Sequence, residues 1–286
     1  MRKILVTGAT GFLGSRILDF YSNKYDICAP THSEMDITNE DNVFSVFDKY
    51  KPDIVVHCAA VSDVGLCEKE PEKSYKINVD GSTIIAKVSR KYQAKCIICS
   101  SDQVYFGSTM EGAHSEEEEL QPFNLYGQEK LKAEQECLNI NPDCVLLRLS
   151  WMYDVRAIRE GEHGDFFRNL LPQISGSGEL SYPIYDKRGI TDVNEVVENL
   201  EKTFQIAGGV YNFGAPNDKD TYYTIYEVFS NVGLDVSRLR KNQEAFKDNP
   251  RNICMSQDKI AKCGISFSTT VNGLSRSFKK VLCDLG

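Results

Sequence analysis

The chain of 286 residues is short of histidine, of long apolar runs and of positive charge. Its four scattered histidines form no HxxxH-type pair that would predict a metal site: His32, His57, His114 and His163. No apolar run reaches the ~18 residues of a membrane-spanning helix. Lysine and arginine number 33 against 41 aspartates and glutamates, a net charge of −8. This balance argues against nucleic acid and anionic membranes as partners.

The N-terminus, MRKILVTGATG, holds too short an apolar run for a signal peptide, so we expect a cytoplasmic protein. Cysteine is abundant, with ten residues, and we expect reduced thiols in that compartment. Cys96 and Cys99 form a CxxC pair, but residues three apart on a strand lie on opposite faces. No second pair supplies the spacing of a metal site, so we expect none.

Short β-rich runs alternate with longer amphipathic runs through the first half of the chain. The predicted strands cover residues 3–8, 25–30, 53–60, 95–101 and 144–150, and the predicted helices cover residues 12–22, 39–50, 71–91 and 126–139. Apolar strands alternating with helices predict a parallel sheet covered by helices on both faces. The expected fold class is α/β, a Rossmann-type doubly wound sheet.

The alternation weakens after Trp151. Residues 154–184 read as irregular, and later segments predict helices at 192–205, 224–233 and 271–284 and a strand at 209–216. We therefore predict a dinucleotide-binding domain of residues 1–150, to which 185–215 returns. Residues 151–184 and 216–286 are expected to form a smaller, substrate-binding lobe.

The stretch TGATGFLG, residues 7–14, predicts a dinucleotide-binding turn, because it follows an apolar strand and opens a helix. Gly8 permits a sharp turn, Gly11 permits close approach of a pyrophosphate, and Gly14 permits the helix to pack on the strand. The helix N-terminus offers N–H groups and partial positive charge to phosphates. The same turn includes Thr10, Phe12 and Leu13. A purely structural strand–helix turn is the alternative.

The end of the second strand bears on the choice of cofactor. An acidic residue there would bind the ribose 2′-hydroxyl of NAD. This chain instead has Thr31, His32 and Ser33, which are able to donate to a 2′-phosphate and favour NADP, although no arginine is present and Glu34 lies close. After the third strand, the small residues Ala59 and Ala60 leave room for a cofactor.

Tyr126 and Lys130 predict proton-transfer chemistry. Residues four apart share a helix face, and a nearby ammonium and a cationic nicotinamide lower the pKa of a phenol. The tyrosine then exchanges a proton with a carbonyl or alcohol, and Lys130 is able to hold the nicotinamide ribose. A serine at the end of the preceding strand, Ser100 or Ser101, is placed to bond the reacting oxygen.

These motifs together resemble the extended short-chain dehydrogenase/reductase family, whose TGxxGxxG fingerprint and YxxxK pair match here. The family register selects Ser101 as the catalytic serine. The resemblance further implies that Asp36 and Ile37 contact the adenine and that Asn78 supports the active site from below. Asp36 as a cap or turn residue and Asn78 as a local backbone partner remain the alternatives.

Within that family the chain resembles the dTDP-4-dehydrorhamnose reductases in SSDQVYFG, YGQEKLKAE, LRLSWMY and NPRNICMSQDKIAKCG. The resemblance implies reduction of a 4-keto nucleotide sugar by NADPH and a possible homodimer. It places Asp102, Trp151 and Arg251 near the substrate, Arg251 beside the diphosphate. Trp151 as a core aromatic and Arg251 as a surface cation are the alternatives. No glutamate accompanies Asp102, which disfavours sugar dehydration.

Three segments depart from the reductase pattern: AAVSDVGLCE, HGDFFRNLL and DKRGIT. The RGITDV stretch is also reminiscent of the regulatory β subunit of methionine adenosyltransferase. Other nucleotide-sugar oxidoreductases or epimerases, and a regulatory NADP-binding subunit without catalysis, are therefore the competing hypotheses.

Overall fold

The computed structural model describes residues 1–156, 165–174 and 176–284. Its centre is a six-stranded sheet in which every pair of neighbours is parallel, in the order β2-β1-β3-β4-β5-β10. The strands are β1 (Lys3–Thr7), β2 (Asp26–Cys28), β3 (Ile54–His57), β4 (Lys95–Ser101), β5 (Val145–Leu149) and β10 (Gly209–Phe213). The reversal of strand order beside β1 is the doubly wound topology that the sequence predicted.

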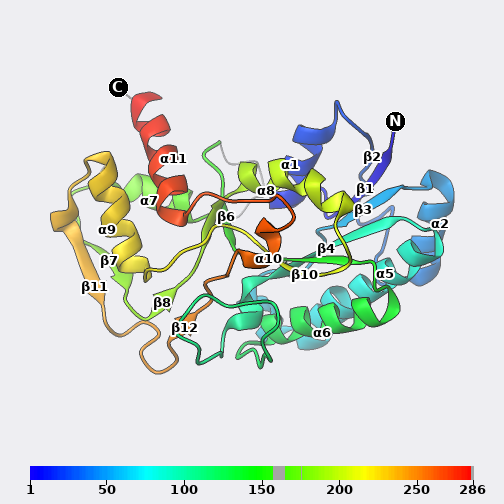
Figure 1. Cartoon of the computed structure of the whole chain (residues 1–286), viewed down its shortest axis with the longest axis horizontal. Helices are drawn as coiled ribbons and strands as arrows, with labels where there is room; N and C mark the ends of the chain where they lie inside the picture. The colour runs from blue at the N-terminus through cyan, green and yellow to red at the C-terminus, as the bar shows by residue number, and fades with distance from the viewer. Residues whose placement is uncertain (157–164, 175, 285–286) are drawn as a thin grey trace.

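Helices cover both faces of the sheet (Figure 1). On one face lie α1 (Phe12–Tyr21) and α8 (Val193–Leu200), which pack against each other. On the other lie α2 (Glu40–Tyr50), α5 (Ser82–Lys91) and α6 (Leu125–Ile140). Two apolar clusters fill the layers, one with Val6, Val56 and Leu147, the other with Leu5, Val55 and Leu146. Neighbouring strand residues thus face opposite sides, which is why these central strands are apolar throughout.

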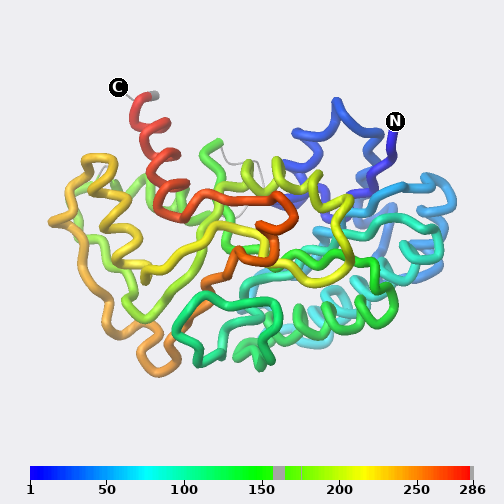
Figure 2. The backbone as a smooth tube through the Cα atoms, in the orientation of Figure 1, coloured from blue at the N-terminus to red at the C-terminus, as the bar shows by residue number. Residues whose placement is uncertain are grey.

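The second lobe lies at the far end of the molecule from β2 (Figures 1 and 2). Its elements are β6 (Trp151–Tyr153), α7 (Phe166–Ile174), β7 (Leu180–Pro183), β8 (Asp186–Lys187), β9 (Ile190–Asp192), α9 (Thr221–Val232), β11 (Leu239–Asn242), β12 (Arg251–Asn252) and α11 (Thr270–Asp284). The short helix α10 (Asp258–Ala261) instead packs against β10 of the central sheet. The strands form three small parallel pairs, β6 with β9, β7 with β11 and β8 with β12. Phe167, Phe229 and Phe278 belong to the apolar cluster of this lobe.

The structure refines several expected elements. The helix expected over 71–91 consists of α4 (Pro71–Tyr75), a π-helical turn (Lys76–Gly81) and α5, and it is preceded by α3 (Val64–Lys69). The segment expected to be irregular contains α7. The domain division stays a prediction, and Ile260 and Ile265 pack into the cluster that contains Val6, so part of 216–286 also lies against the sheet. Within the described ranges no helix is long and apolar enough to cross a membrane.

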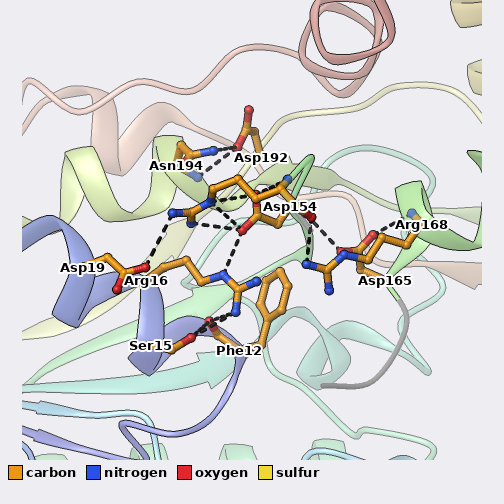
Figure 3. Close-up of polar contacts among 10 residues, drawn as sticks. Phe12, Ser15, Arg16, Asp19, Asp154, Asp165, Arg168, Asp192 and Asn194 are labelled. Carbon is orange, nitrogen blue, oxygen red and sulfur yellow. Dashed lines mark hydrogen bonds and ion pairs between the residues drawn. The ribbon is translucent and has the colours of Figure 1, made fainter. Parts of the chain in front are cut away.

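A buried network of ions joins the sheet domain to the lobe (Figure 3). Arg16 on α1 donates through Nε to Asp154, which follows β6, at 2.9 Å. The Asp154 amide donates to Asp165 at 3.1 Å, and Asp165 pairs with Arg168 of α7 at 3.3 Å. The Arg16 guanidinium also lies 4.4 Å from the centre of the Phe12 ring. The network therefore ties the first turns of α1 to the segment that follows β6.

Candidate active site

A cavity of about 640 Å³ opens at the carboxyl ends of β1, β3, β4 and β5. Ligands of doubly wound sheets bind at this edge. The predicted site residues that line the cavity are Gly8, Thr10, Gly11, Phe12, Leu13, Gly14, Ala60, Ser101, Asp102, Tyr126, Lys130, Trp151 and Arg251. Those that lie outside its lining are Thr31, His32, Ser33, Asp36, Ile37, Ala59 and Asn78.

The glycine turn at one end of the cavity is shaped for a phosphate group. Gly8 has φ +65°, and a Cβ on Gly14 would lie 2.2 Å from the Gly8 carbonyl oxygen, so both positions require glycine. A Cβ on Gly11 would meet the Gly8 oxygen at 3.2 Å, a tight but tolerable distance. Gly11 caps the N-terminus of α1, whose free N–H groups suit a pyrophosphate.

The predicted donors after β2 are partly engaged by Glu34. The Thr31 backbone N–H and hydroxyl donate to the Glu34 carboxylate at 2.8 and 2.9 Å, and the Ser33 hydroxyl lies 3.1 Å from that of Thr31. These bonds from Thr31 lower the pKa of Glu34. Asp36 accepts from the backbone and side chain of Thr38, as the turn alternative predicted. Ile37 packs in the core under Gly81.

Tyr126 is brought to Ser101 by the close approach of α6 to the segment after β4. The Asn124 side chain caps α6 by accepting from the Gly127 amide at 2.7 Å. A Cβ on Gly127 would lie 2.5 Å from the Gln103 carbonyl oxygen, so only glycine permits this packing. Burial raises the pKa of Tyr126, and its hydrogen bond with Ser101 opposes that shift. The pKa of Tyr126 is thus raised, opposite to the lowering that the sequence predicted, because burial outweighs the nearby ammonium, and the phenol is protonated at neutral pH.

Lys130 lies one helical turn after Tyr126 and is buried. Its Nζ donates to the Cys99 carbonyl oxygen at 3.0 Å and lies 5.8 Å from the centre of the Tyr126 ring. Burial lowers the pKa of Lys130. The competing serine, Ser100, also lines the cavity, but its hydroxyl donates to Glu134 at 2.5 Å, whereas Ser101 is hydrogen-bonded with Tyr126.

Asn78 is buried outside the cavity lining, and its side chain bonds residues far away in the sequence rather than only the local backbone. Its carboxamide accepts from the Val61 amide at 2.8 Å and donates to the Val61 carbonyl at 3.0 Å and to Glu129 at 2.7 Å. Glu129, between Tyr126 and Lys130 on α6, was missed in the sequence. The sequence shows Glu129 only as a glutamate in YGQEK, and a glutamate on a helix is equally consistent with an exposed surface position.

The far end of the cavity carries two guanidinium groups. Arg251 donates to Asp186 at 2.7 Å, and Arg188 lies 4.6 Å from the centre of the Trp151 ring and 3.8 Å from Asp102. Burial raises the pKa of Asp102 and lowers that of Arg188. Arg188 was also missed in the sequence, although it lies in DKRGIT, one of the segments that depart from the reductase pattern.

The sequence model of the family described as RmlD substrate binding domain matches residues 1–282. The chain belongs to this family. An RmlD relative, the dTDP-4-dehydrorhamnose reductase of Mycolicibacterium smegmatis, is 32% identical over 247 residues, which cover 84% of this chain and 72% of that protein. Methionine adenosyltransferase 2 subunit beta of Pongo abelii is 31% identical over an alignment of 303 residues, which covers 99% of this chain and 89% of that protein.

Solved structures have the same fold. The dTDP-4-dehydrorhamnose reductase of Bacillus anthracis, in complex with NADP, matches with a TM-score of 0.85 at 24% identity and covers 98% of this chain and 100% of that one. The predicted α/β, doubly wound fold and the resemblance to the reductase family are thereby confirmed.

Proposed function

We propose that this protein is an NADPH-dependent reductase of a 4-keto deoxysugar nucleotide, with dTDP-4-dehydrorhamnose as the substrate and dTDP-rhamnose as the product. The observation that carries the proposal is the convergence of Ser101, Tyr126 and Lys130 in one cavity. The glycine turn lies at one end of that cavity and two arginines at the other. The names of the relatives from Mycolicibacterium smegmatis and Bacillus anthracis support the same substrate.

The cofactor site fits a dinucleotide, because Gly8 and Gly14 let the turn pack closely on its own backbone and Gly11 caps α1, whose free N–H groups would face a pyrophosphate. NADPH, when bound, supplies a hydride to the carbonyl carbon of the sugar. NADP is favoured over NAD by the solved relative that contains NADP, although the Thr31 hydroxyl donates to Glu34 in this structure.

The chain's own residues handle the proton. Tyr126 donates its phenolic proton to the carbonyl oxygen as that oxygen gains negative charge, and the Ser101 hydroxyl donates a hydrogen bond to the same oxygen. Lys130 stabilises the phenolate that Tyr126 becomes and holds a ribose hydroxyl. Asn78 acts through Val61 and Glu129 by fixing the positions of the loop and helix around these groups.

A regulatory subunit is the second candidate, because the relative named methionine adenosyltransferase 2 subunit beta matches 99% of the chain. A subunit that only binds NADP does not require a buried Tyr126 hydrogen-bonded with Ser101, so this pair favours a reductase over a regulatory subunit. A cytoplasmic location and a homodimer remain further parts of the proposal.

The deciding experiment follows the absorbance of NADPH with dTDP-4-dehydrorhamnose for the wild type and for Tyr126→Phe. We expect turnover in the wild type and a loss of about 100-fold or more in the variant, with NADPH binding retained. Tyr75→Phe, which alters an exposed tyrosine, serves as the matched control. NADPH binding without turnover in the wild type would contradict the reductase assignment and favour a regulatory subunit.

A further inference from the structure

Two thiols lie side by side in the wall of the cavity. Sγ of Cys58 and Sγ of Cys99 are 3.6 Å apart, and both cysteines are partly exposed and line the cavity. Both also contact the apolar cluster that contains Val6, so packing as small apolar groups is the plain alternative for them. The proton transfer proposed above uses neither thiol.

The backbone places the two cysteines at a spacing that a disulfide is able to bridge. His57 pairs with Ile98 in the parallel ladder of β3 and β4. The next residue of each segment, Cys58 and Cys99, therefore oppose each other across the two strands. Neighbouring strands are about 4.8 Å apart, and a disulfide joins Cα atoms about 4.4 to 6.8 Å apart. Bond formation brings the sulfur atoms from 3.6 Å to about 2 Å, which small side-chain rotations achieve.

The two thiols differ in acidity, which suits an oxidation that begins at a thiolate. The hydrogen bond with Cys58 and the ammonium of Lys130 lower the pKa of Cys99, against the effect of burial. The hydrogen bond with Cys99 and burial raise the pKa of Cys58. Cys99 is therefore the nucleophile of the pair, and Cys58 is the thiol that attacks it afterwards.

A second pair of thiols in the same sheet provides an internal comparison. Ile97 pairs with Val145 in β4 and β5, which sets the register of these strands. Cys96 consequently lies opposite Cys144, and their side chains are hydrogen-bonded. These two side chains are 1% and 0% exposed and belong to the apolar cluster on the other face of the sheet. This buried pair has the spacing of a disulfide but lacks the access that the cavity gives to Cys58 and Cys99.

We propose that Cys58 and Cys99 form a modification site at which hydrogen peroxide oxidises the two thiols to a disulfide. The Cys99 thiolate attacks one peroxide oxygen, the O–O bond breaks, and the leaving hydroxide takes up a proton to become water. Sγ of Cys58 then attacks the sulfenic sulfur of Cys99, the S–O bond breaks, and a second water leaves with the Cys58 proton. In all, the thiols lose two electrons and two protons, and the peroxide becomes two waters.

The disulfide would lie in the same cavity wall as the glycine turn and Lys130. The Cys99 carbonyl accepts from Lys130, so drawing the ends of β3 and β4 together alters the group that holds this lysine. We therefore expect bound NADP to slow the oxidation and the oxidised protein to bind NADP less tightly. This consequence rests on the proposed cofactor site, whereas the oxidation itself does not.

The experiment treats the full chain with hydrogen peroxide, alkylates the remaining thiols and locates the disulfide by tandem mass spectrometry. Fragmentation within peptides is required, because Cys96 and Cys99 are only three residues apart. We expect a bond between Cys58 and Cys99 that dithiothreitol reverses, while Cys96 and Cys144 stay reduced. With NADP at about ten times its Kd the bond should form about tenfold more slowly, and fluorescence titration should show weaker NADP binding after oxidation.

Three variants serve as controls. Cys58→Ser and Cys99→Ser should each abolish the bond, whereas Cys28→Ser should retain it, because Cys28 is also partly exposed but its thiol is hydrogen-bonded with Tyr50. A wild type in which peroxide leaves Cys58 and Cys99 unjoined would overturn the proposal, and so would equally fast joining of Cys96 and Cys144.

The cofactor arm has outcomes of its own. If NADP binds the reduced protein but neither slows the oxidation nor binds more weakly afterwards, the link between the disulfide and the cofactor is refuted. If the disulfide forms but the reduced protein does not bind NADP, the modification site stands and the proposed cofactor site fails.

Discussion

The carboxamide of Asn78 donates a 2.7 Å hydrogen bond to the carboxylate of Glu129, and both side chains are buried. The same carboxamide holds Val61, whose neighbours Ala60 and Ser62 line the cavity. One side chain therefore links the loop after β3 to the helix that carries Tyr126.

Replacing Asn78 with alanine should impair both stability and catalysis. The Val61 amide and Glu129 would lose a partner, at a cost of about 2–4 kcal/mol in the free energy of unfolding. Displacement of the loop and helix should lower kcat about 10- to 100-fold. Asn141→Ala is the control, because Asn141 is also buried but bonds Ala86 outside the cavity. Equal losses of kcat in the two variants would refute the positioning role.

The pH dependence of the reaction should differ between its two directions. Reduction requires the protonated phenol, and burial raises the pKa of Tyr126, so this rate should not fall between about pH 6 and pH 9. The reverse oxidation requires the phenolate and should become faster as the pH rises through that range. Initial rates in both directions provide the measurement, and a reduction rate that declines across this range would contradict Tyr126 as the donor.

Gly11→Ala should weaken NADPH binding while leaving the fold intact. Its Cβ meets the Gly8 oxygen at 3.2 Å, which a small shift relieves, but the methyl group would occupy the approach of the pyrophosphate. We expect affinity for NADPH to fall about tenfold or more by fluorescence titration, with an unchanged circular dichroism spectrum. Gly112→Ala is the control, since no heavy atom lies within 4 Å of its Cβ position. Unchanged affinity in Gly11→Ala would place the phosphates elsewhere.

Glu34→Gln should shift the cofactor preference toward NADPH. The carboxylate lies against the hydroxyl of Thr31, where it repels a 2′-phosphate. We expect the ratio of the NADH to the NADPH dissociation constant to rise about fivefold. Glu179→Gln, far away in the second lobe, should leave the ratio unchanged. A lower ratio would mean that Glu34 does not face the 2′ position.

His57 should make the protein less stable in mild acid. Burial lowers its pKa to about 3, against an ordinary value of 6.5. The unfolded state therefore binds more protons between these values, and stability is lost as the pH falls below about 6.5. The loss attributable to this group is about 2 kcal/mol at pH 5.

Denaturant unfolding of His57→Gln and of the control His32→Gln, which replaces an exposed histidine, measures this dependence. Between about pH 7 and pH 5 the stability of His57→Gln should change less than that of the wild type, whatever its absolute value. Parallel pH profiles for the wild type and His57→Gln would rule out the buried histidine as a cause.

The sequence by itself determined the features that depend on neighbouring residues. Apolar runs alternating with amphipathic runs predicted the central strands and helices, because burial imposes periodicity locally. The turn at 7–14 was recognised because glycine is required by the backbone there, and the spacing of Tyr126 and Lys130 follows from one turn of helix. The strands β6, β7, β8, β9, β11 and β12 have two to four residues each, too few to show a period.

Only the tertiary structure decided which distant side chains meet. Glu129 and Arg188 are a carboxylate and a guanidinium that the sequence alone would place equally well on the surface. Packing places both side chains. Gly127 lets α6 approach Gln103, and Gly189 lets the segment between β8 and β9 approach Ala215. Such contacts join residues that are far apart in the chain. Their free energy comes from burial and the exclusion of water, and the pattern of neighbouring residues in the sequence does not show which distant groups are buried together.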